Sequence, residues 1–474
     1  MTSVDNIIVV LYLGGVLSLG LMASRGVRTL DSFSVAGRSY SSFIVFATLS
    51  ASFIGGGFTM GNAEKVFLFG IGNIFALWGF SLKEIIVASF FAPRMDQFSR
   101  AISVGDIMGE SYGKPAKIVS GFLGVVLCAG IVGAQVGAMG YVFQLFLGID
   151  HLWGILVGCG IAIAYSTVGG MKAVIFTDVL QFVLLAIGIP LTLLIGVHHA
   201  GGWEVMIEAV PVDHFKILGN RTLLGFISLF LTFLLGETLV PPYVQRLLIG
   251  RTAVQTRWGT MWSGLLSIPF FAVTGLIGLV ALTLDANLDA NLALPFVVEQ
   301  TLPIGLKGLI VAGIISVVMS SADSFLNGAA VAFSNDVVNP LRRKPLSEKQ
   351  QLVLAKAVTV MVGVLAVVFA VKIRSILDIL IWAYNFWAPT IVIPMGAALL
   401  GIRTATWVFV AAAVAGLAGA LVWEQGFGAP GGIDGLIIGV FCNLGLFLVG
   451  YRLERMSRQK EKRGSHRGRP SISK

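Results

Sequence analysis

The stretch ASFIGGGFTMGNAEKVF, residues 51–67, places three consecutive glycines, Gly55, Gly56 and Gly57, inside a long apolar segment. Glycine lacks a side chain and has low helix propensity, so a helix through this stretch is expected to break. Within a membrane, the backbone groups freed by a break are tolerated only where they line a cavity or contact another polar group. The stretch therefore predicts that the freed backbone groups line a cavity or contact another polar group.

The composition places this break within a polytopic membrane protein. Of the 474 residues, 56% are hydrophobic and only 12% are charged, and the mean hydropathy is +0.89. A soluble domain of this size carries far more charge on its surface. The three cysteines lie in apolar segments and form neither a disulfide framework nor a metal-ligand spacing. The start, MTSVDN, has no basic region and is not expected to be a cleaved signal peptide.

Apolar stretches of about 20 residues, the length that crosses a hydrocarbon core of roughly 30 Å, predict about thirteen membrane-spanning helices. We expect an all-α transmembrane domain over residues 1–450, followed by a basic cytoplasmic tail over 451–474. The predicted spans are 6–24, 42–70, 71–93, 118–147, 152–168, 173–198, 222–249, 258–284, 304–335, 351–371, 376–402, 405–423 and 432–450.

The basic residues determine the expected orientation of these spans. Of the 33 Lys and Arg residues, 26 fall in one alternate set of connections and four in the other. Basic connections face the cytoplasm, so we expect the N-terminus outside the cell membrane and the C-terminus inside. The net charge of +9 comes largely from the tail, which we interpret as facing anionic lipid rather than nucleic acid.

A second break is predicted by LLGETLVPPYVQR, where Glu237 is followed by Pro241 and Pro242. Two prolines delete two backbone donors and clash with the preceding helical turn. Taken singly, the two interruptions are also consistent with a close-packing notch and an ordinary proline kink. However, they open two successive sets of five spans, about 42–198 and 222–402, which have opposite orientations. Paired breaks in inverted repeats are typical of the central binding site of a secondary transporter.

The polar stretch VMSSADSFL, around Ser320 and Ser321, lies in the ninth predicted span. Ser320, Asp323 and Ser324 are spaced i, i+3 and i+4 and therefore share one helix face. The carbonyl of Val317, one turn earlier, points along the same side. Hydroxyls and carbonyls suit weak, reversible binding of a small monovalent cation, whereas serines bonded to their own helix would be structural.

Asp323 is the residue of this stretch that most needs a partner. An aspartate at mid-membrane costs at least about 2.5–3.5 kcal/mol. A second acid, Asp178, lies a few residues into the sixth predicted span. Two acids with cations between them, or two unpartnered acids that hold a proton, are both consistent with the sequence.

Three motifs, ASFIGGG, GGMKAVIFTDVLQ and VMSSADSFLN, together resemble the sodium/solute symporter family. The similarity extends over nearly the whole chain. It implies a LeuT-type fold of two inverted five-helix repeats, with one leading and two trailing helices. It also implies alternating access driven by the sodium gradient.

The resemblance implies a sodium site made of backbone carbonyls and two hydroxyls. Matched residue by residue, its ligands are Ala51, Ile54, Val317, Ser320 and Ser321.

A second site, present in some members of the family, corresponds here to Asp178, Ser320, Asp323 and Ser324. Asp323 stands where many members have a serine or another small residue. It could make this site more anionic or carry a proton, so sodium and proton coupling both stay open.

Within the family, FIGGGFTMGNAEKVF and VMSSADS are most similar to the high-affinity choline transporters. The aromatic cage that a quaternary ammonium needs is not retained. Phe53, Val240 and Cys128 stand where the resemblance leads us to expect tryptophan. The likeness therefore supports the scaffold more than choline as the solute.

The solute is expected between the two breaks, walled by spans three, four and eleven. Glu237 could accept an ammonium group or a sugar hydroxyl, or it could be structural and pair with Lys65 or Lys83. Glu64 with Lys65, and Lys83 with Glu84, are expected to pair with one another. The aromatic residues could equally be lipid or packing residues. The candidate lining residues are Phe53, Gly56, Trp78, Gln135, Glu237, Tyr243, Trp382 and Tyr384.

These observations predict a sodium-coupled importer of a small organic solute, amine-bearing or zwitterionic, such as an amino acid, betaine or vitamin. The alternatives are a proton-coupled symporter on the same scaffold and a solute sensor without net transport, which the short tail disfavours. No histidine has a nucleophile or acid at motif spacing, so we expect no enzyme and no cofactor beyond the coupling ion. The expected partners are the solute, sodium and the lipid bilayer, with no nucleic acid, and we expect a functional monomer.

Overall fold

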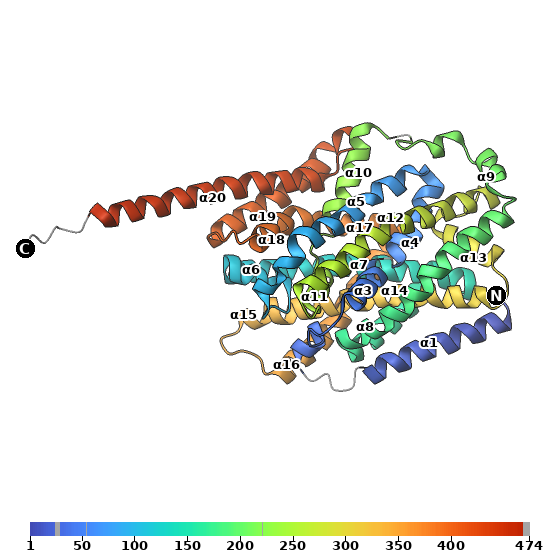
Figure 1. Ribbon diagram of the computed structural model, residues 1–474, viewed down its shortest axis with the longest axis horizontal. Helices are drawn as coiled ribbons and strands as arrows, with labels where there is room; N and C mark the ends of the chain where they lie inside the picture. Colours follow the sequence, from blue (N-terminus) through green and yellow to red (C-terminus); the bar gives the residue numbers. More distant parts are fainter. Residues whose placement is uncertain (24–28, 54, 220, 468–474) are drawn as a thin grey trace, which may run out of the picture.

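The computed structural model describes the chain except for residues 24–28, 54, 220 and 468–474. Its elements are helices, with one isolated bridge between Tyr40 and Gly250 in the described part (Figure 1). Short π-helical segments extend several of the long helices. The α-helices are α1 (Ser3–Ala23), α2 (Leu30–Val35), α3 (Ser42–Phe53), α4 (Gly56–Phe69), α5 (Gly72–Ile86), α6 (Val104–Tyr112), α7 (Lys114–Leu147), α8 (His151–His199), α9 (Trp203–Ala209), α10 (Leu223–Leu235), α11 (Pro241–Leu248), α12 (Ala253–Leu284), α13 (Ala293–Thr301), α14 (Leu306–Val331), α15 (Asn339–Leu341), α16 (Glu348–Lys372), α17 (Ile376–Trp387), α18 (Ile393–Leu399), α19 (Thr406–Leu421) and α20 (Gly435–Arg467).

The predicted all-helical membrane architecture is confirmed. Within the described residues, 10 helices are long and apolar enough to cross a membrane, and the bent pair α3 and α4 adds one further span. Two shorter apolar helices, His151–Ala164 and Leu223–Leu235, lie at the remaining predicted positions. Each predicted span therefore contains an apolar helix.

The fifth and sixth predicted spans are joined more tightly than expected. Both belong to α8, which continues without a connecting loop around Lys172. Gly170 alone is non-helical inside it, with φ 63° and ψ 176°. A residue with a side chain rarely adopts this φ, so one glycine turns the chain between the two spans.

Both predicted breaks are present. The axes of α3 and α4 differ by 50° across the glycine stretch. Between α10 and α11, Leu239 adopts a left-handed conformation with φ 55°. Pro241 and Pro242 are the first residues of α11, where the missing donors cost nothing because these N–H groups have no partner within the helix. The prolines therefore start the second half-helix instead of kinking a continuous one.

Helix α14 lies at the centre of the bundle and positions the polar stretch (Figure 1). It packs against α7 and α8 and also contacts α1, α3, α4 and α11. Both broken helices therefore meet the helix that carries Ser320 and Ser321. At one side, α19 and α20 pack against each other, and α20 continues as one helix past residue 450 to Arg467 (Figure 1).

Candidate functional site

The glycine break and the polar stretch of α14 meet. The Ser321 hydroxyl donates a hydrogen bond to the Ser52 carbonyl at the end of α3, at 3.0 Å. A Cβ added to Gly55 would lie 2.1 Å from Ser321 Oγ. A Cβ on Gly56 would lie 2.8 Å from a Val318 methyl. The glycines are therefore required because α14 approaches the α3 and α4 backbone too closely for side chains.

The residues proposed for the sodium site lie on these same two elements. Ala51, at the end of α3, is buried, as are Val317, Ser320 and Ser321 on α14. Ile54 lies outside the described residues. Ser321 faces the break, but the Ser320 hydroxyl donates instead to a carboxylate oxygen of Asp178. Adjacent serines thus point toward two different polar groups.

Asp178 is partnered by an arginine. The Arg246 guanidinium forms an ion pair with Asp178 at 3.1 Å, and neither side chain is exposed. The same guanidinium donates to the Ser324 hydroxyl at 2.6 Å and to the Thr48 carbonyl at 3.3 Å. The Thr48 and Ser320 hydroxyls both donate to the Asp178 carboxylate. The position expected between Asp178 and Ser324 therefore holds a cationic side chain.

Arg246 corrects one assignment made from the sequence. Its charge places it at the start of a cytoplasmic connection, 246–257, but the side chain is fully buried. The short helix α11 begins only at Pro241, so Arg246 lies one turn into it and faces Asp178 on α8. The signal that could have found it is Asp178 itself, because a buried carboxylate needs a counter-charge.

Asp323 points away from this pair, toward the N-terminal helix. It is fully buried, and both of its carboxylate oxygens lack a hydrogen-bond partner among the described residues. It lines a cavity of about 20 Å³ with Gln181, Ser316 and Ser320, closed by apolar residues of α1. Gln181 donates to the Ser316 hydroxyl at 2.7 Å, which leaves its own side-chain oxygen without a described partner. The cavity is of a size for one water or one small cation.

Gln135 is the predicted solute residue that reaches the glycine break. Its side-chain oxygen lies 3.2 Å from the positions that a Cβ on Gly55 or on Gly56 would occupy. The Gln135 oxygen has no hydrogen-bond partner among the described residues. Of Phe53, only the backbone is described.

Glu237 lies between the two halves of the second broken helix and is buried. Its carboxylate accepts a hydrogen bond from the Tyr384 hydroxyl at 3.1 Å. The Trp387 indole N–H donates to the Thr238 carbonyl at 2.9 Å, in the same break. Tyr384 and Trp387 of α17 therefore supply hydrogen bonds to the segment between α10 and α11, where the backbone no longer forms helical hydrogen bonds.

A buried ion pair accompanies Glu237. Lys83 pairs with Glu84 at 2.7 Å, as expected, and the Tyr243 hydroxyl donates to Glu84 at 3.2 Å. The Lys83 ammonium also lies 3.7 Å from the centre of the Phe80 ring. Lys83 and Glu84 are close enough to interact electrostatically with Glu237. The cluster thus contains two carboxyl groups and one ammonium.

The other predicted pairs and aromatic residues contact neighbouring helices. Lys65 bonds to Glu64 at 3.4 Å and to Asp378 at 2.9 Å. The Trp78 indole donates to a carbonyl of α12 at 3.1 Å. Trp382 is 37% exposed and packs against other aromatic rings. That Trp78 and Trp382 contact the solute remains a prediction.

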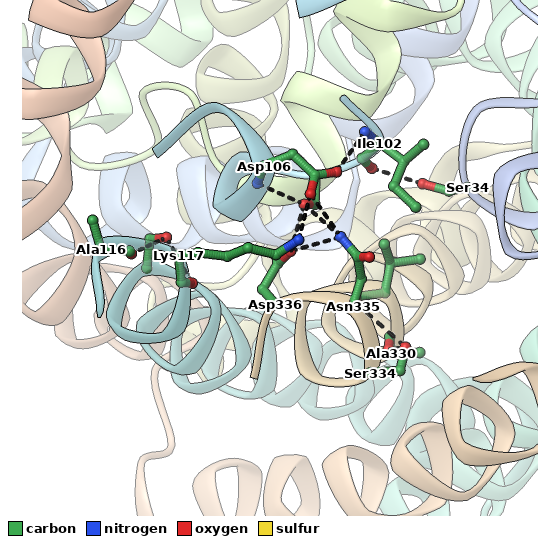
Figure 2. A network of polar contacts seen from close by, with 12 residues as sticks. Ser34, Ile102, Asp106, Ala116, Lys117, Ala330, Ser334, Asn335 and Asp336 are labelled. Carbon is green, nitrogen blue, oxygen red and sulfur yellow. Dashed lines mark hydrogen bonds and ion pairs between the residues drawn. The ribbon is translucent and has the colours of Figure 1, made fainter. Parts of the chain in front are cut away.

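A second polar network, which sequence reasoning did not identify, joins α6, the start of α7 and the π-helical end of α14 (Figure 2). Lys117 pairs with Asp106 at 2.6 Å and lies 3.8 Å from Asp336. Asn335 donates to Asp106 at 3.0 Å. A Cβ on Gly105 would lie 2.2 Å from the Asp336 carboxyl carbon, so glycine makes room for this buried acid. The network holds α6 against α14, the helix that carries Ser320 and Ser321.

Two paired broken helices around a central polar helix define a membrane transporter of the inverted-repeat class. The chain belongs to the sodium:solute symporter family, whose sequence profile matches residues 33–402. The resemblance seen in the motifs is thereby confirmed. The family and the structural neighbours are transporters and not enzymes.

Curated relatives are about a quarter identical to the chain over the aligned residues. High-affinity choline transporter 1 of Drosophila melanogaster is 26% identical over 80% of this chain and 63% of its own length. The high-affinity proline transporter PutP of Bacillus subtilis is 23% identical over 86% of this chain and 90% of its own. The chain thus spans less than two thirds of the fly protein.

Among solved structures, a Na+-coupled sialic acid symporter superposes with a TM-score of 0.77. It is 19% identical to this chain, and the match covers 93% of this chain and 98% of the symporter. At this identity the likeness shows the fold, and the predicted LeuT-type architecture is confirmed.

Proposed function

We propose that the protein is a sodium-coupled symporter that imports a small amine-bearing or zwitterionic solute by alternating access. The observation that carries the proposal is the contact of Ser321 with the end of α3. Carbonyls at a helix C-terminus carry partial negative charge, and a neighbouring hydroxyl completes a weak cation site. Ala51, Ile54, Val317, Ser320 and Ser321 are the proposed ligands. Sodium entering the cell gains about 2.3 kcal/mol per 100 mV from the membrane potential.

The sodium site is tested by removing one ligand hydroxyl. A hydrogen bond or ligand to a charged group contributes about 1.5–3 kcal/mol, so Ser321→Ala should raise the sodium concentration for half-maximal uptake roughly 10–100-fold. Uptake into proteoliposomes, with sodium replaced by potassium as the reference, measures this. Ser111→Ala, a buried serine of α6 whose hydroxyl has no described partner, is the matched control. Equal sodium dependence in both variants would reject the site.

We propose that the residues of the second site do not bind one ion together, because they face two different surroundings. These residues are Asp178, Ser320, Asp323 and Ser324. Arg246 supplies the positive charge for Asp178 and Ser324. A second sodium at Asp178 would therefore have to displace the guanidinium during the cycle. Asp323 lines a separate small cavity beside α1. One sodium per cycle is the stoichiometry that this arrangement favours.

Proton coupling is the second candidate function, favoured by the Asp323 carboxyl, which has no partner within the described part of the chain. A buried carboxyl without a counter-charge is held more readily in its protonated form. If it carries a proton, Asp323→Asn should remove the pH-dependent part of uptake while leaving solute exchange. The melting temperature should not fall, because asparagine has nearly the same shape and no buried charge. Exposed Asp96→Asn is the control, and a pH profile that survives Asp323→Asn excludes this role.

An amine-bearing solute is proposed from the charges around the second break. Glu84 already pairs with Lys83, which leaves the buried Glu237 carboxyl as the acceptor for an ammonium group of the solute. Gln135 offers an oxygen beside the first break that has no hydrogen-bond partner among the residues the structure describes. Phe53, Gly56, Trp78, Tyr243 and Trp382 complete the proposed lining. The names of the choline and proline transporters among the relatives fit this solute class.

A screen of the purified protein tests the solute class directly. Choline, betaines, proline and other amino acids are added with and without sodium, and the melting temperature is recorded. A ligand that binds only the folded state raises it. Stabilisation by an amine-bearing class only in the presence of sodium supports the proposal, whereas stabilisation by sugars alone contradicts the amine-bearing solute class.

The arrangement in the membrane completes the proposal. The N-terminus is placed outside and the basic C-terminal tail in the cytoplasm of the cell membrane, following the basic connections. The transporting unit is residues 1–450, with repeats of about 42–198 and 222–402, and it functions as a monomer.

A further inference from the structure

An apolar groove of about 360 Å³ opens between α5, α10, α18 and α20. Its lining is almost wholly apolar and includes Phe91, Leu235 and Gly396. Leu400 and Leu448 line it too and are each 50% exposed, which places them at its outer edge. In a membrane-spanning bundle, such a groove faces lipid.

A basic pocket of about 410 Å³ continues this groove. The two share Ile402, and α20 passes from the groove at Leu448 to the pocket at Tyr451 and Arg455. One further turn along the same helix brings Arg458 into the pocket. The apolar groove and the basic pocket therefore form one continuous surface.

The positive charge of the pocket arginines is not fully balanced by neighbouring acids and is available to an anionic ligand. Arg403 pairs with Glu110 at 2.9 Å, and both side chains are exposed. Glu454 already accepts the Ala405 N–H at 2.7 Å and bonds to Arg458. Arg455 makes no ion pair with any described residue. Exposed ion pairs are weak and exchange readily with another anion.

The pocket lies where α20 leaves the bundle. Helix α20 has 33 residues and is therefore about 50 Å long, well beyond a hydrocarbon core of roughly 30 Å. Figure 1 shows its C-terminal half projecting past the other helices. Because α20 is longer than the hydrocarbon core, we expect these arginines at headgroup level and the groove at acyl-chain depth.

We propose that the groove and the basic pocket together bind one anionic phospholipid of the leaflet on the basic side. An acyl chain lies in the groove, and the headgroup phosphate contacts Arg403, Arg455 and Arg458. Planar guanidinium groups bind phosphate oxygens through paired hydrogen bonds, and an acyl chain matches the apolar lining. Because Leu235 and Thr238 also line the groove, the bound lipid supports the wall of the second helix break beside Glu237.

The headgroup contact is tested with the purified full-length protein. Native mass spectrometry and melting temperature are measured with phosphatidylglycerol, phosphatidylcholine and inorganic phosphate. Phosphatidylglycerol should be retained and should stabilise most. Each basic residue near a membrane surface contributes about a fivefold effect, so Arg403→Gln/Arg455→Gln/Arg458→Gln should weaken its binding about 100-fold. Arg342→Gln/Arg343→Gln, in an exposed turn on the same basic side, should bind as the parent does.

The chain contact is tested by filling the groove. A Cβ on Gly396 would be in ordinary contact with the Phe91 ring at 3.6 Å, so Gly396→Leu extends into the groove. Leu448→Trp does so from an exposed position where folding is not at risk. Both should lose retained phosphatidylglycerol. Equal binding of the neutral lipid, stabilisation by phosphate alone, or retention unchanged in both filled variants would each overturn the proposal.

Discussion

Replacing Arg246 by glutamine is expected to destabilise the folded protein by about 3–5 kcal/mol, the usual result of removing one partner of a buried ion pair. The Asp178 carboxylate would then stay buried without its counter-charge. The guanidinium also joins Thr48 on α3, Asp178 on α8 and Ser324 on α14. Its loss therefore releases contacts among the three helices that form the proposed ion site.

The double variant Asp178→Asn/Arg246→Gln separates the effect of charge from that of packing. If uncompensated charge is the cause, this variant should melt at a higher temperature than Arg246→Gln alone, because neither position of the pair then carries a buried charge. Lys216→Gln breaks an ion pair between two exposed side chains and should leave the melting temperature almost unchanged. A melting temperature of Arg246→Gln equal to that of Lys216→Gln would contradict the buried pair.

Gly55→Ala is expected to abolish sodium-dependent uptake and to destabilise the protein by about 1–3 kcal/mol through overpacking. The new methyl group would lie 2.1 Å from Ser321 Oγ and 3.2 Å from the Gln135 oxygen. The α14 hydroxyl must move away from the α3 carbonyls for the methyl to fit. Uptake at several sodium concentrations and the sodium-dependent rise in melting temperature measure both effects.

Gly160→Ala is the matched control for this substitution. Gly160 lies in α8, and an added Cβ there would have no neighbour within 4 Å. Alanine has the higher helix propensity, so this change should be neutral or stabilising by up to about 1 kcal/mol. Normal sodium-dependent uptake in Gly55→Ala would show that the close approach of α14 is not part of the site.

Much of the fold could be predicted because its signals are local. Runs of apolar residues indicate spans, and glycines or adjacent prolines indicate breaks, within a window of a few turns. A polar contact or cavity at the glycine stretch was also predicted, because freed carbonyls at membrane depth need one. That Ser321 makes this contact was implied by the family resemblance. A connection between the fifth and sixth spans was predicted at residues 169–172, but Gly170 was not singled out as its turning point, because the sequence does not show that helix continues on both sides of it.

The site could be predicted only in part. Helical spacing shows which residues share a face, but it does not show which other helix packs against that face. Ser320, Asp323 and Ser324 are close in sequence, and helical spacing alone places them together. In the structure, Ser320 and Ser324 join the Asp178–Arg246 pair, while Asp323 turns toward α1. The direction of each side chain depends on which helices pack on either side of α14.

The sequence by itself determined the class of protein, the positions of the spans and the two breaks, because hydropathy and helix propensity act between neighbouring residues. Only the tertiary structure decided which polar groups pair. The contacts of Asp178 join it to residues 68 and 142 positions away along the chain, Arg246 and Ser320. Such partners depend on helix packing, which brings segments that are distant in the sequence side by side, and no local signal in the sequence encodes that packing.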